Sequence, residues 1–169
     1  HLGEPHHVEH TVVRRPVVFC LDRAGITGDN GPSHHGVYDL ALLAKVPGMR
    51  VLAPSSAQEL QVMLHDALIL ADEGPVAIRY PNGTAPQVGE HEVGVGLHAN
   101  KLRNGDGSVC ILAIGKLVAF ANQAATVLAG QGIDATVWDV RSCAPLDTAM
   151  IEDAAAHRRR GRGHAAHAA

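Results

Sequence analysis

Two arginines of the sequence, Arg23 and Arg79, stand where apolar runs give way to polar residues. Arg23 follows the run at residues 16–21, and Arg79 lies at the end of the run at residues 76–80. If these runs form neighbouring parallel strands, both side chains lie at the carboxyl edge of a sheet, where α/β proteins bind their ligands. Two guanidinium groups there suit a phosphate or a carboxylate, because each is a rigid fork of hydrogen-bond donors. On sequence alone, the alternative that each arginine pairs with a local carboxylate such as Asp22 stays equally open.

A histidine, His34, lies in the glycine-flanked loop GDNGPSHHG at residues 28–36. Glycines let the backbone approach a ligand closely, and an imidazole can carry a proton near neutral pH. The competing interpretation is a solvent-exposed or structurally bonded ring, which is the commoner state of an isolated loop histidine. A metal site at His34 and His35 is not predicted, because adjacent residues rarely point at one ion and no third ligand stands nearby.

Other motifs carry less information about chemistry. The segment Gly105-Asp106-Gly107 is similar to the start of a diphosphate–magnesium motif, but it precedes an apolar run and is interpreted as a turn. The glycines at 25–36 fit neither GxGxxG nor GxxxxGK[ST], which argues against a dinucleotide site or a P-loop. The cysteines form no CxxC pair and lie in or beside apolar runs, so core packing is predicted for Cys20, Cys110 and Cys143.

The composition of the 169-residue chain favours an α/β protein. Apolar residues make up 46%, aromatic residues only 3%, and Ala, Val, Leu and Gly dominate, as in closely packed parallel α/β layers. The formal net charge is −3, so the total charge indicates neither nucleic acid nor an anionic membrane as a partner. No apolar run reaches the roughly 18 residues of a membrane-spanning helix, and no secretion signal opens the chain. A cytoplasmic protein is expected.

Regular structure is predicted for most of the middle of the chain. Strands are expected at residues 16–21, 49–53 and 76–80, with helices at 37–44 and 57–71. Three strands joined by crossover segments imply a parallel sheet.

A second α/β unit follows a glycine-rich, polar linker at residues 84–107, in which a short β excursion is expected near 93–97. The unit should contain a strand at 108–114, a helix at 115–129 and a strand at 135–140. It is too short to close a sheet alone, so the chain is expected to end inside its second domain.

The two ends of the chain differ from the middle. Residues 1–15 show neither helical nor strand periodicity, and residues 158–169 form a basic, low-complexity tail that is expected to break the helical pattern before it. Two origins fit these ends: natural flexible segments, or a frame shift in the source sequence. A solvated tail is preferred over a nucleic-acid patch, because no stacking aromatic residues are interleaved with the arginines.

The regular segments together resemble the 1-deoxy-D-xylulose-5-phosphate synthase family. The resemblance covers residues 16–157 and rests on PVVFCLDRAGITGDNGPSHHG, GPVAIRYPNG, SVCILAIGKLV and ATVWDVRSCAPLD. It implies an incomplete transketolase-like, thiamine-diphosphate-binding fold with a parallel sheet at residues 16–83. After the linker it implies the start of a transketolase C-terminal domain at 108–157.

The resemblance also implies a reaction and roles for residues of this chain. Family members use thiamine diphosphate and Mg²⁺ to condense pyruvate with D-glyceraldehyde 3-phosphate, releasing CO₂, and the product feeds isoprenoid, thiamine and pyridoxal synthesis. Arg23 and Arg79 resemble the pair that holds the phosphate of the acceptor, and His34 resembles the loop histidine that contacts substrate and assists proton transfer. Asn30 stands where the family usually has aspartate, with Asp29 one position earlier, and both are expected to contact substrate.

The segments that hold the metal, the diphosphate and the thiazolium-activating glutamate in the family have no counterpart in this sequence. The chain is therefore expected to be a piece of a homodimeric enzyme, with acceptor-binding residues but no cofactor or metal ligands, and inactive alone. The alternatives are another member of the superfamily, such as transketolase or the β subunit of a 2-oxoacid dehydrogenase, and a non-catalytic partner subunit.

Overall fold

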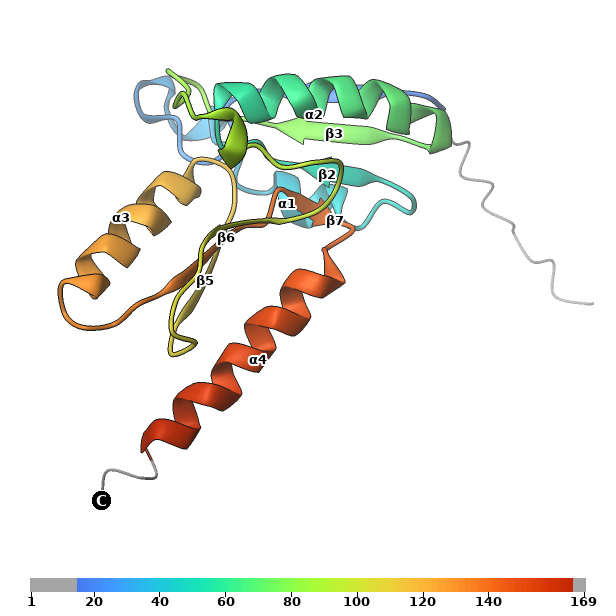
Figure 1. The fold of residues 1–169 in the computed structure, drawn as a ribbon. Coiled ribbons are helices and arrows are strands. Elements are labelled where there is room, and N and C mark those ends of the chain that lie inside the picture. Colours follow the sequence, from blue (N-terminus) through green and yellow to red (C-terminus); the bar gives the residue numbers. More distant parts are fainter. Residues whose placement is uncertain (1–14, 166–169) are drawn as a thin grey trace, which may run out of the picture.

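The first sheet has four strands, and the segments that contain Arg23 and Arg79 lie at its edge. The structure, a computed structural model, describes residues 15–165 without the side chains of Asp29 and of residues 157–165, so nearly all of the segment 1–15 lies outside it. The order of strands in this sheet is β1 (Val18–Leu21), β3 (Val76–Arg79), β2 (Arg50–Leu52) and β7 (Ser142–Ala144) (Figure 1). β1, β3 and β2 are parallel, which confirms the topology predicted from the apolar runs.

Two helices belong to this unit, the short α1 (Asp39–Leu43) and the longer α2 (Ala57–Leu70). α2 begins after Ser56, whose Oγ accepts a hydrogen bond from the backbone N–H of Glu59 at 3.1 Å. The helix packs its apolar side on the parallel strands, where a core forms from Leu52, Met63, Ala67, Val76 and Ile78.

β7 is a strand that the sequence pattern did not predict. It runs antiparallel to β2, with Val51 opposite Ala144 and Leu52 opposite Ser142. The strand is short, contains a polar residue and is followed by a proline, so it shows no apolar run. Through β7 the second unit completes the sheet of the first.

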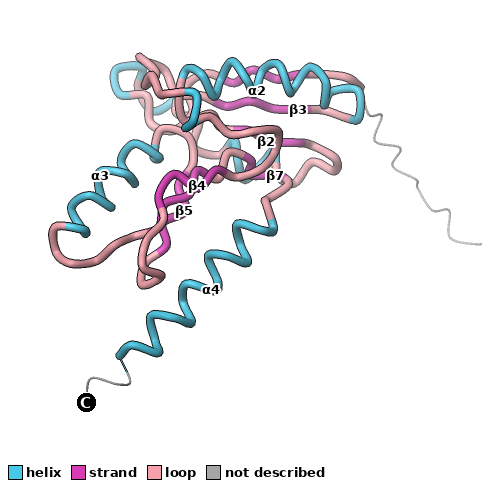
Figure 2. The backbone as a smooth tube through the Cα atoms, viewed as in Figure 1, coloured by secondary structure: helices cyan, strands magenta, loops and turns pink. Residues whose placement is uncertain are grey.

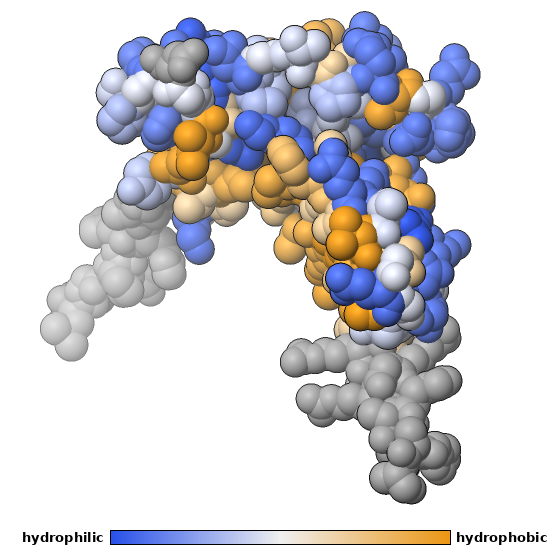
Figure 3. Space-filling view, turned by 90° about the vertical axis from the view of Figure 1, so that its left-hand side faces the viewer, coloured by the Kyte–Doolittle hydropathy of each residue, from blue (hydrophilic) through white to orange (hydrophobic). Residues whose placement is uncertain are grey.

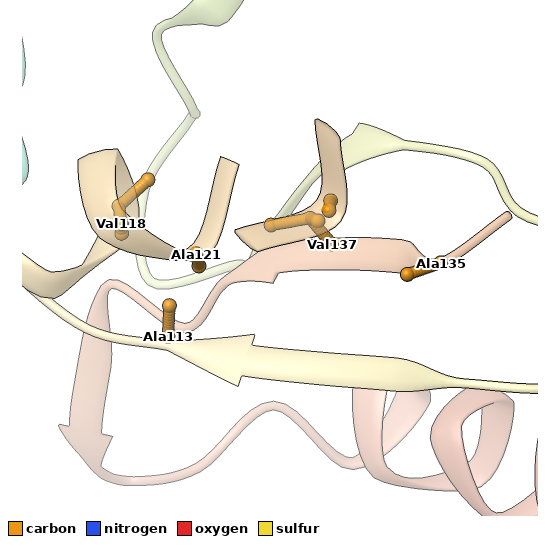
Figure 4. Close-up of a cluster of buried hydrophobic side chains, with 6 residues drawn as sticks. Ala113, Val118, Ala121, Ala135 and Val137 are labelled. Atoms are coloured by element: carbon orange, nitrogen blue, oxygen red, sulfur yellow. The ribbon is translucent and has the colours of Figure 1, made fainter. Parts of the chain in front are cut away.

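The second sheet has the order β4 (Asn100–Arg103), β6 (Thr136–Asp139), β5 (Cys110–Ala113). β5 and β6 are parallel, as predicted, whereas β4 runs antiparallel to β6. Helix α3 (Leu117–Ala129) packs on this sheet through small side chains, and Figure 4 shows Val118 and Ala121 of α3 close to Ala113 and Val137 of the strands.

The β excursion predicted at residues 93–97 is wrong. The chain forms a short 3₁₀ turn at Glu90–Glu92 (η4), crosses the junction of the two units as a loop, and becomes a strand only at β4 (Figure 2). Glycine alternates with valine in this segment and weakens a strand. The carbonyl groups of Gly96 and His98 instead accept hydrogen bonds from Arg141.

Two further expectations need correction. Helix α4 (Thr148–Ala165) continues into the basic tail that was expected to break it, because Arg and Ala are favourable helix residues. Cys20 was predicted to be buried and is exposed, since β1 is the edge strand of its sheet. Within residues 15–165, no helix is both long and apolar enough to cross a bilayer.

Candidate functional site

The loops that follow β1 and β3 are held together at the carboxyl edge of the first sheet. Leu21 at the end of β1 is in register with Arg79 at the end of β3. Beyond the strands, the backbone N–H of Ala24 donates to the carbonyl of Tyr80 at 3.0 Å, and that of Gly36 donates to the carbonyl of Arg23 at 3.0 Å. The structure thus places the segments that carry Arg23 and Arg79 side by side, which meets the condition on which the two-arginine interpretation depended.

Arg23 also makes the local contact that was the alternative interpretation. Its guanidinium group pairs with Asp22, and the side chains of Arg23 and Asp22 remain 38% and 59% exposed. Arg23 has a backbone φ of 59°, and its buried Nε has no hydrogen-bond partner in the structure. An exposed carboxylate of this kind is weakly bound, so part of the donor set of Arg23 stays available to a ligand.

Arg79 is more enclosed, with a side chain that is 12% exposed. Its Nη2 donates to the carbonyl of Gly36 at 3.1 Å, and its Nε lies 3.6 Å from Oδ2 of Asp39 without forming a hydrogen bond. A Cβ at position 36 would lie 2.6 Å from both the Arg23 carbonyl and the Asp39 carboxylate. Only glycine permits this close approach of the loop to Arg23 and Asp39.

His34 does not reach the arginines through any contact in the structure. It is exposed, and its Nδ1 lies 3.1 Å from Oγ of its neighbour Ser33. The next residue has the structural role that was the alternative for His34: Nδ1 of His35 accepts the backbone N–H of Thr27 at 3.2 Å. This acceptor role places the proton of a neutral His35 on Nε2. The sequence analysis missed this function of His35.

Asn30 contacts the loop that follows β3. Its Oδ1 accepts a hydrogen bond from Nδ2 of Asn82 at 3.2 Å, and both side chains are exposed. Asp29 lies beside it in the short 3₁₀ helix Gly28–Asn30 (η1). The structure therefore brings the amide of Asn30 next to the loop that follows Arg79.

Two cavities open at this edge, between the two units. One has a volume of about 460 Å³ and is lined by residues of the Arg23 and Arg79 loops and by the segment 114–117 of the second unit. The other has a volume of about 650 Å³ and is lined mainly by residues 80–86, with Asp22, Ser55 and Phe120. Arg79 borders the first cavity and Lys116 borders both, whereas Arg23, Asn30 and His34 line neither.

The junction between the units contains a buried ion pair that sequence reasoning did not find. Nε of Arg141 donates to Oε2 of Glu59 at 2.8 Å, and both side chains are fully buried. Oε1 of Glu59 accepts the backbone N–H of Gly94 at 2.5 Å, and Nη1 of Arg141 donates to the carbonyls of Gly96 and His98 at 2.9 and 2.7 Å. No spacing signal exists for this pair, because its members lie 82 residues apart.

Asp139, at the end of β6, lies next to this pair. Its Oδ2 accepts a hydrogen bond from Oγ of Ser55 at 2.6 Å, and its Oδ1 accepts one from the backbone N–H of Arg141 at 3.1 Å. Burial raises the pKa of Asp139 to about 6, and its hydrogen bonds act in the opposite direction. Ser55, Asp139 and Arg141 thus join the loop after β2 to the second unit.

The chemistry of the described residues suits an anion better than a metal ion. Within the part of the chain that the structure describes, no three His, Cys, Asp or Glu side chains come together as metal ligands. The charged groups at the cavity of about 460 Å³ are Arg79 and Lys116, both cations. This arrangement can hold a phosphate or a carboxylate.

Comparison with known proteins gives two family matches. Residues 9–87 match the model of the transketolase pyrimidine binding domain, and residues 97–161 match the model of the transketolase C-terminal domain. The 1-deoxy-D-xylulose-5-phosphate synthase of Chlorobium phaeovibrioides is 46% identical over 140 residues, which are 81% of this chain and 22% of that protein. That of Gloeobacter violaceus is 48% identical over 141 residues, which are 80% of this chain and 22% of that protein.

Solved structures give the same fold. A split gene transketolase, described as an inactive beta4 tetramer, matches with a TM-score of 0.71 and 32% identity, over 82% of this chain and 44% of that one. A transketolase variant from Pichia stipitis matches with a TM-score of 0.67 and 25% identity, over 75% of this chain and 19% of that one. The chain spans about a fifth of the length of the curated relatives it matches.

Proposed function

Since the chain belongs to the transketolase family, and within it to the 1-deoxy-D-xylulose-5-phosphate synthases, we propose that it forms the acceptor-binding part of such a synthase. The whole enzyme would condense pyruvate with D-glyceraldehyde 3-phosphate and release CO₂, for isoprenoid and thiamine synthesis in the cytoplasm. The observation that carries the proposal is the pairing of the Arg23 and Arg79 loops at one sheet edge, beside a largely apolar cavity that Arg79 and Lys116 border.

The two arginines would hold the phosphate group of the acceptor. The Nε atom of each arginine has no hydrogen-bond partner. Arg23 is paired with the exposed carboxylate of Asp22, and the carboxylate of Asp39 lies 3.6 Å from Arg79. A phosphate dianion carries more charge than either carboxylate and accepts bidentate hydrogen bonds from guanidinium groups. The apolar walls of the cavity would strengthen this attraction by excluding water.

His34 and the neighbouring loop would contact the reacting part of the substrate. Its ring is exposed and therefore accessible to a substrate, and an imidazole is a group that can act as a general acid or base. Asn30 and Asp29 would contact the same substrate, with Asn30 offering hydrogen bonds but no charge. The glycines at 28, 31 and 36 allow the loop to approach the ligand closely.

The described residues do not fit a magnesium diphosphate group, because they contain no metal-ligand cluster and no acidic residue lines the cavity of about 460 Å³. Thiamine diphosphate, when bound, supplies the carbon nucleophile for attack on pyruvate. We assign the binding of thiamine diphosphate and Mg²⁺ to other parts of the whole protein, of which this chain matches about a fifth.

We also propose a division of the chain into units at residues 16–83 and 108–157, joined by 84–107. The support for two units is the presence of two sheets, although β4 of the second sheet lies within 84–107 and β7 pairs with β2 of the first unit. Residues 158–169 would be a basic extension. We also propose that the whole enzyme is a homodimer. Figure 3 shows apolar side chains gathered along the hollow face of the molecule, which a second copy would cover.

A second candidate is a subunit that works with a separate cofactor-binding chain. Its support is the likeness to a split gene transketolase. Sequencing the coding DNA across both ends of the chain distinguishes the two candidates. A continuous frame with the missing family segments supports the single-chain enzyme, and a separate neighbouring gene that encodes them supports the subunit.

The proposed phosphate site is tested by replacing Arg79 with methionine. We expect Arg79→Met to weaken binding of D-glyceraldehyde 3-phosphate to the chain by about tenfold or more, because a charge-assisted hydrogen bond is lost from an enclosed site. Isothermal titration calorimetry measures the dissociation constant, and circular dichroism checks folding. Arg103→Met is the matched control, since Arg103 pairs with Asp134 on the second sheet. Equal affinity of the wild type and Arg79→Met would contradict the proposal.

A further inference from the structure

The cavity of about 460 Å³ is lined from both units of the chain. The first unit contributes Arg79 and the loop residues Ala24 and Gly36, and the second contributes residues 114–117. We propose that Lys116 completes the phosphate site from the second unit, so that the phosphomonoester is held across the junction. This inference rests on the proposed function and names a cation that the resemblance did not assign.

The lining of the cavity selects for an anion. Arg79 and Lys116 are its charged residues, and none of the aspartates and glutamates whose side chains the structure describes lines it. The remaining walls are backbone and apolar side chains, among them Ile26, Val37 and Leu117. Two cations on opposite units with apolar surface between them match a small molecule that has one doubly charged group and a short carbon chain.

The charge of Lys116 is available to a ligand. Among the residues that the structure describes, no acidic side chain lies within ion-pair distance of Lys116, whereas Lys101 contacts Asp153 at 2.9 Å. Lys116 is exposed and also borders the cavity of about 650 Å³, whose acidic residue Asp22 is paired with Arg23. Among the side chains that the structure describes, none therefore forms an ion pair with the ammonium group of Lys116 where the ligand would bind.

The backbone holds Lys116 against the first unit. The preceding Gly115 has a φ of 56°, and a Cβ there would lie 3.6 Å from the carbonyl oxygen of Pro54 and 3.8 Å from Cβ of Ala53. Ala53 itself donates its N–H to the carbonyl of Arg141 at 2.9 Å. The turn before α3 is thus packed on the end of β2, and Lys116 is directed from a fixed point of the junction.

Arg79 and Lys116 would contribute differently to binding of the phosphate group. The guanidinium group of Arg79 offers directed donors to phosphate oxygens, and the ammonium group of Lys116 acts as a compact point charge on a flexible stem. Lys116 would then favour phosphorylated over non-phosphorylated acceptors and leave the binding of pyruvate unchanged.

The test is the substitution Lys116→Met in the 169-residue chain, which keeps the length of the side chain and removes its charge. Titration calorimetry at low salt measures binding of D-glyceraldehyde 3-phosphate, D-glyceraldehyde and pyruvate. We expect a dissociation constant for the phosphorylated ligand about fivefold higher in Lys116→Met, partial retention in Lys116→Arg, and no change for the other two ligands. Lys45→Met is the matched control, because Lys45 is exposed and lines neither cavity.

The outcomes separate this inference from the proposed function. Unchanged binding in Lys116→Met together with weaker binding in Arg79→Met would overturn the role of Lys116 and leave the arginine site standing. Weaker binding of pyruvate but not of D-glyceraldehyde 3-phosphate would also overturn it, since the cation would then serve a carboxylate. If the wild-type chain binds no phosphorylated ligand, both the inference and the proposed function fail.

Discussion

Three arginines of this chain lie in two contrasting regions, the junction between the units and the open edge of the first sheet. Arg141 at the junction is fully buried, paired with Glu59 and hydrogen-bonded to two carbonyl groups. Arg79 at the edge is 12% exposed and donates to one carbonyl, and Arg23 is 38% exposed with a partner on its own loop. Arg141 is thus fully enclosed and held by a counter-ion and two carbonyl groups, with Nη2 alone unpaired, whereas the side chains of Arg23 and Arg79 keep part of their surface exposed.

The two regions differ in the free energy that is lost when the partners of an arginine are removed. A buried charge is costly unless it is paired and hydrogen-bonded, so the partners of Arg141 cannot be removed without a large loss of stability. An exposed pair contributes little, so the partners of Arg23 can be exchanged for a ligand at low cost. The comparison predicts that variants at the junction change stability, whereas variants at the edge change binding.

The largest expected effect comes from breaking the junction pair with Glu59→Gln. The substitution leaves the charge of Arg141 buried without its counter-ion, and we expect the free energy of unfolding to fall by about 3–5 kcal/mol. Urea unfolding followed by circular dichroism measures the change. The double variant Glu59→Met with Arg141→Met removes both charges and should recover part of the loss. A loss no larger than that of Arg79→Met would remove the distinction between the two regions.

The second-largest expected effect is a pH dependence of stability that comes from Asp139 at the junction. The pKa of Asp139 is raised from 3.8 to about 6 in the folded chain, so between these pH values the folded state binds more protons than the unfolded state. Stability should therefore fall as pH rises from about 4 to about 6, by roughly 2 to 3 kcal/mol from this group.

The variant Asp139→Asn isolates this contribution. Urea midpoints of both proteins are measured from pH 4 to pH 7, and the midpoint of the wild type minus that of the variant should decrease as pH rises. Other titrating groups contribute equally to both proteins and cancel in this difference. The pKa of Asp147 is lowered by hydrogen bonds and would act in the opposite direction in both proteins. A flat difference would show that Asp139 does not titrate in this range.

The smallest effect is expected on the surface, at the ion pair of Arg50 with Glu73. Glu73 is 68% exposed, so Glu73→Gln should change the free energy of unfolding by less than about 1 kcal/mol. Added salt should then no longer affect stability through this pair, because one of its charges is gone. The same urea measurement provides the reference for Glu59→Gln. A loss comparable to that at Glu59 would indicate that burial is not what distinguishes the two ion pairs.

Much of the candidate site was predictable from local sequence. The apolar runs before Arg23 and at Arg79, separated by crossover segments, predicted parallel strands, which the structure confirms, and the structure adds that these two strands are neighbours. The glycines of the loop 28–36 predicted close approach of the backbone to a ligand, which stays a prediction, and Gly36 shows a close approach within the protein, to Arg23 and Asp39. The functional roles of Arg23, Arg79, His34, Asn30 and Asp29 remain predictions that the binding experiments test.

By itself, the sequence determined the parallel α/β units and the polar edge that follows their strands, because these depend on periodicity and on turn residues close together in the chain. Only the tertiary structure decided which distant groups meet: the β7 strand in the first sheet, the pairing of Glu59 with Arg141, and Lys116 beside the cavity of Arg79. The reason is physical. Buried charges and shared cavities are defined by partners tens of residues apart, and no local pattern encodes a partner that packing alone brings near.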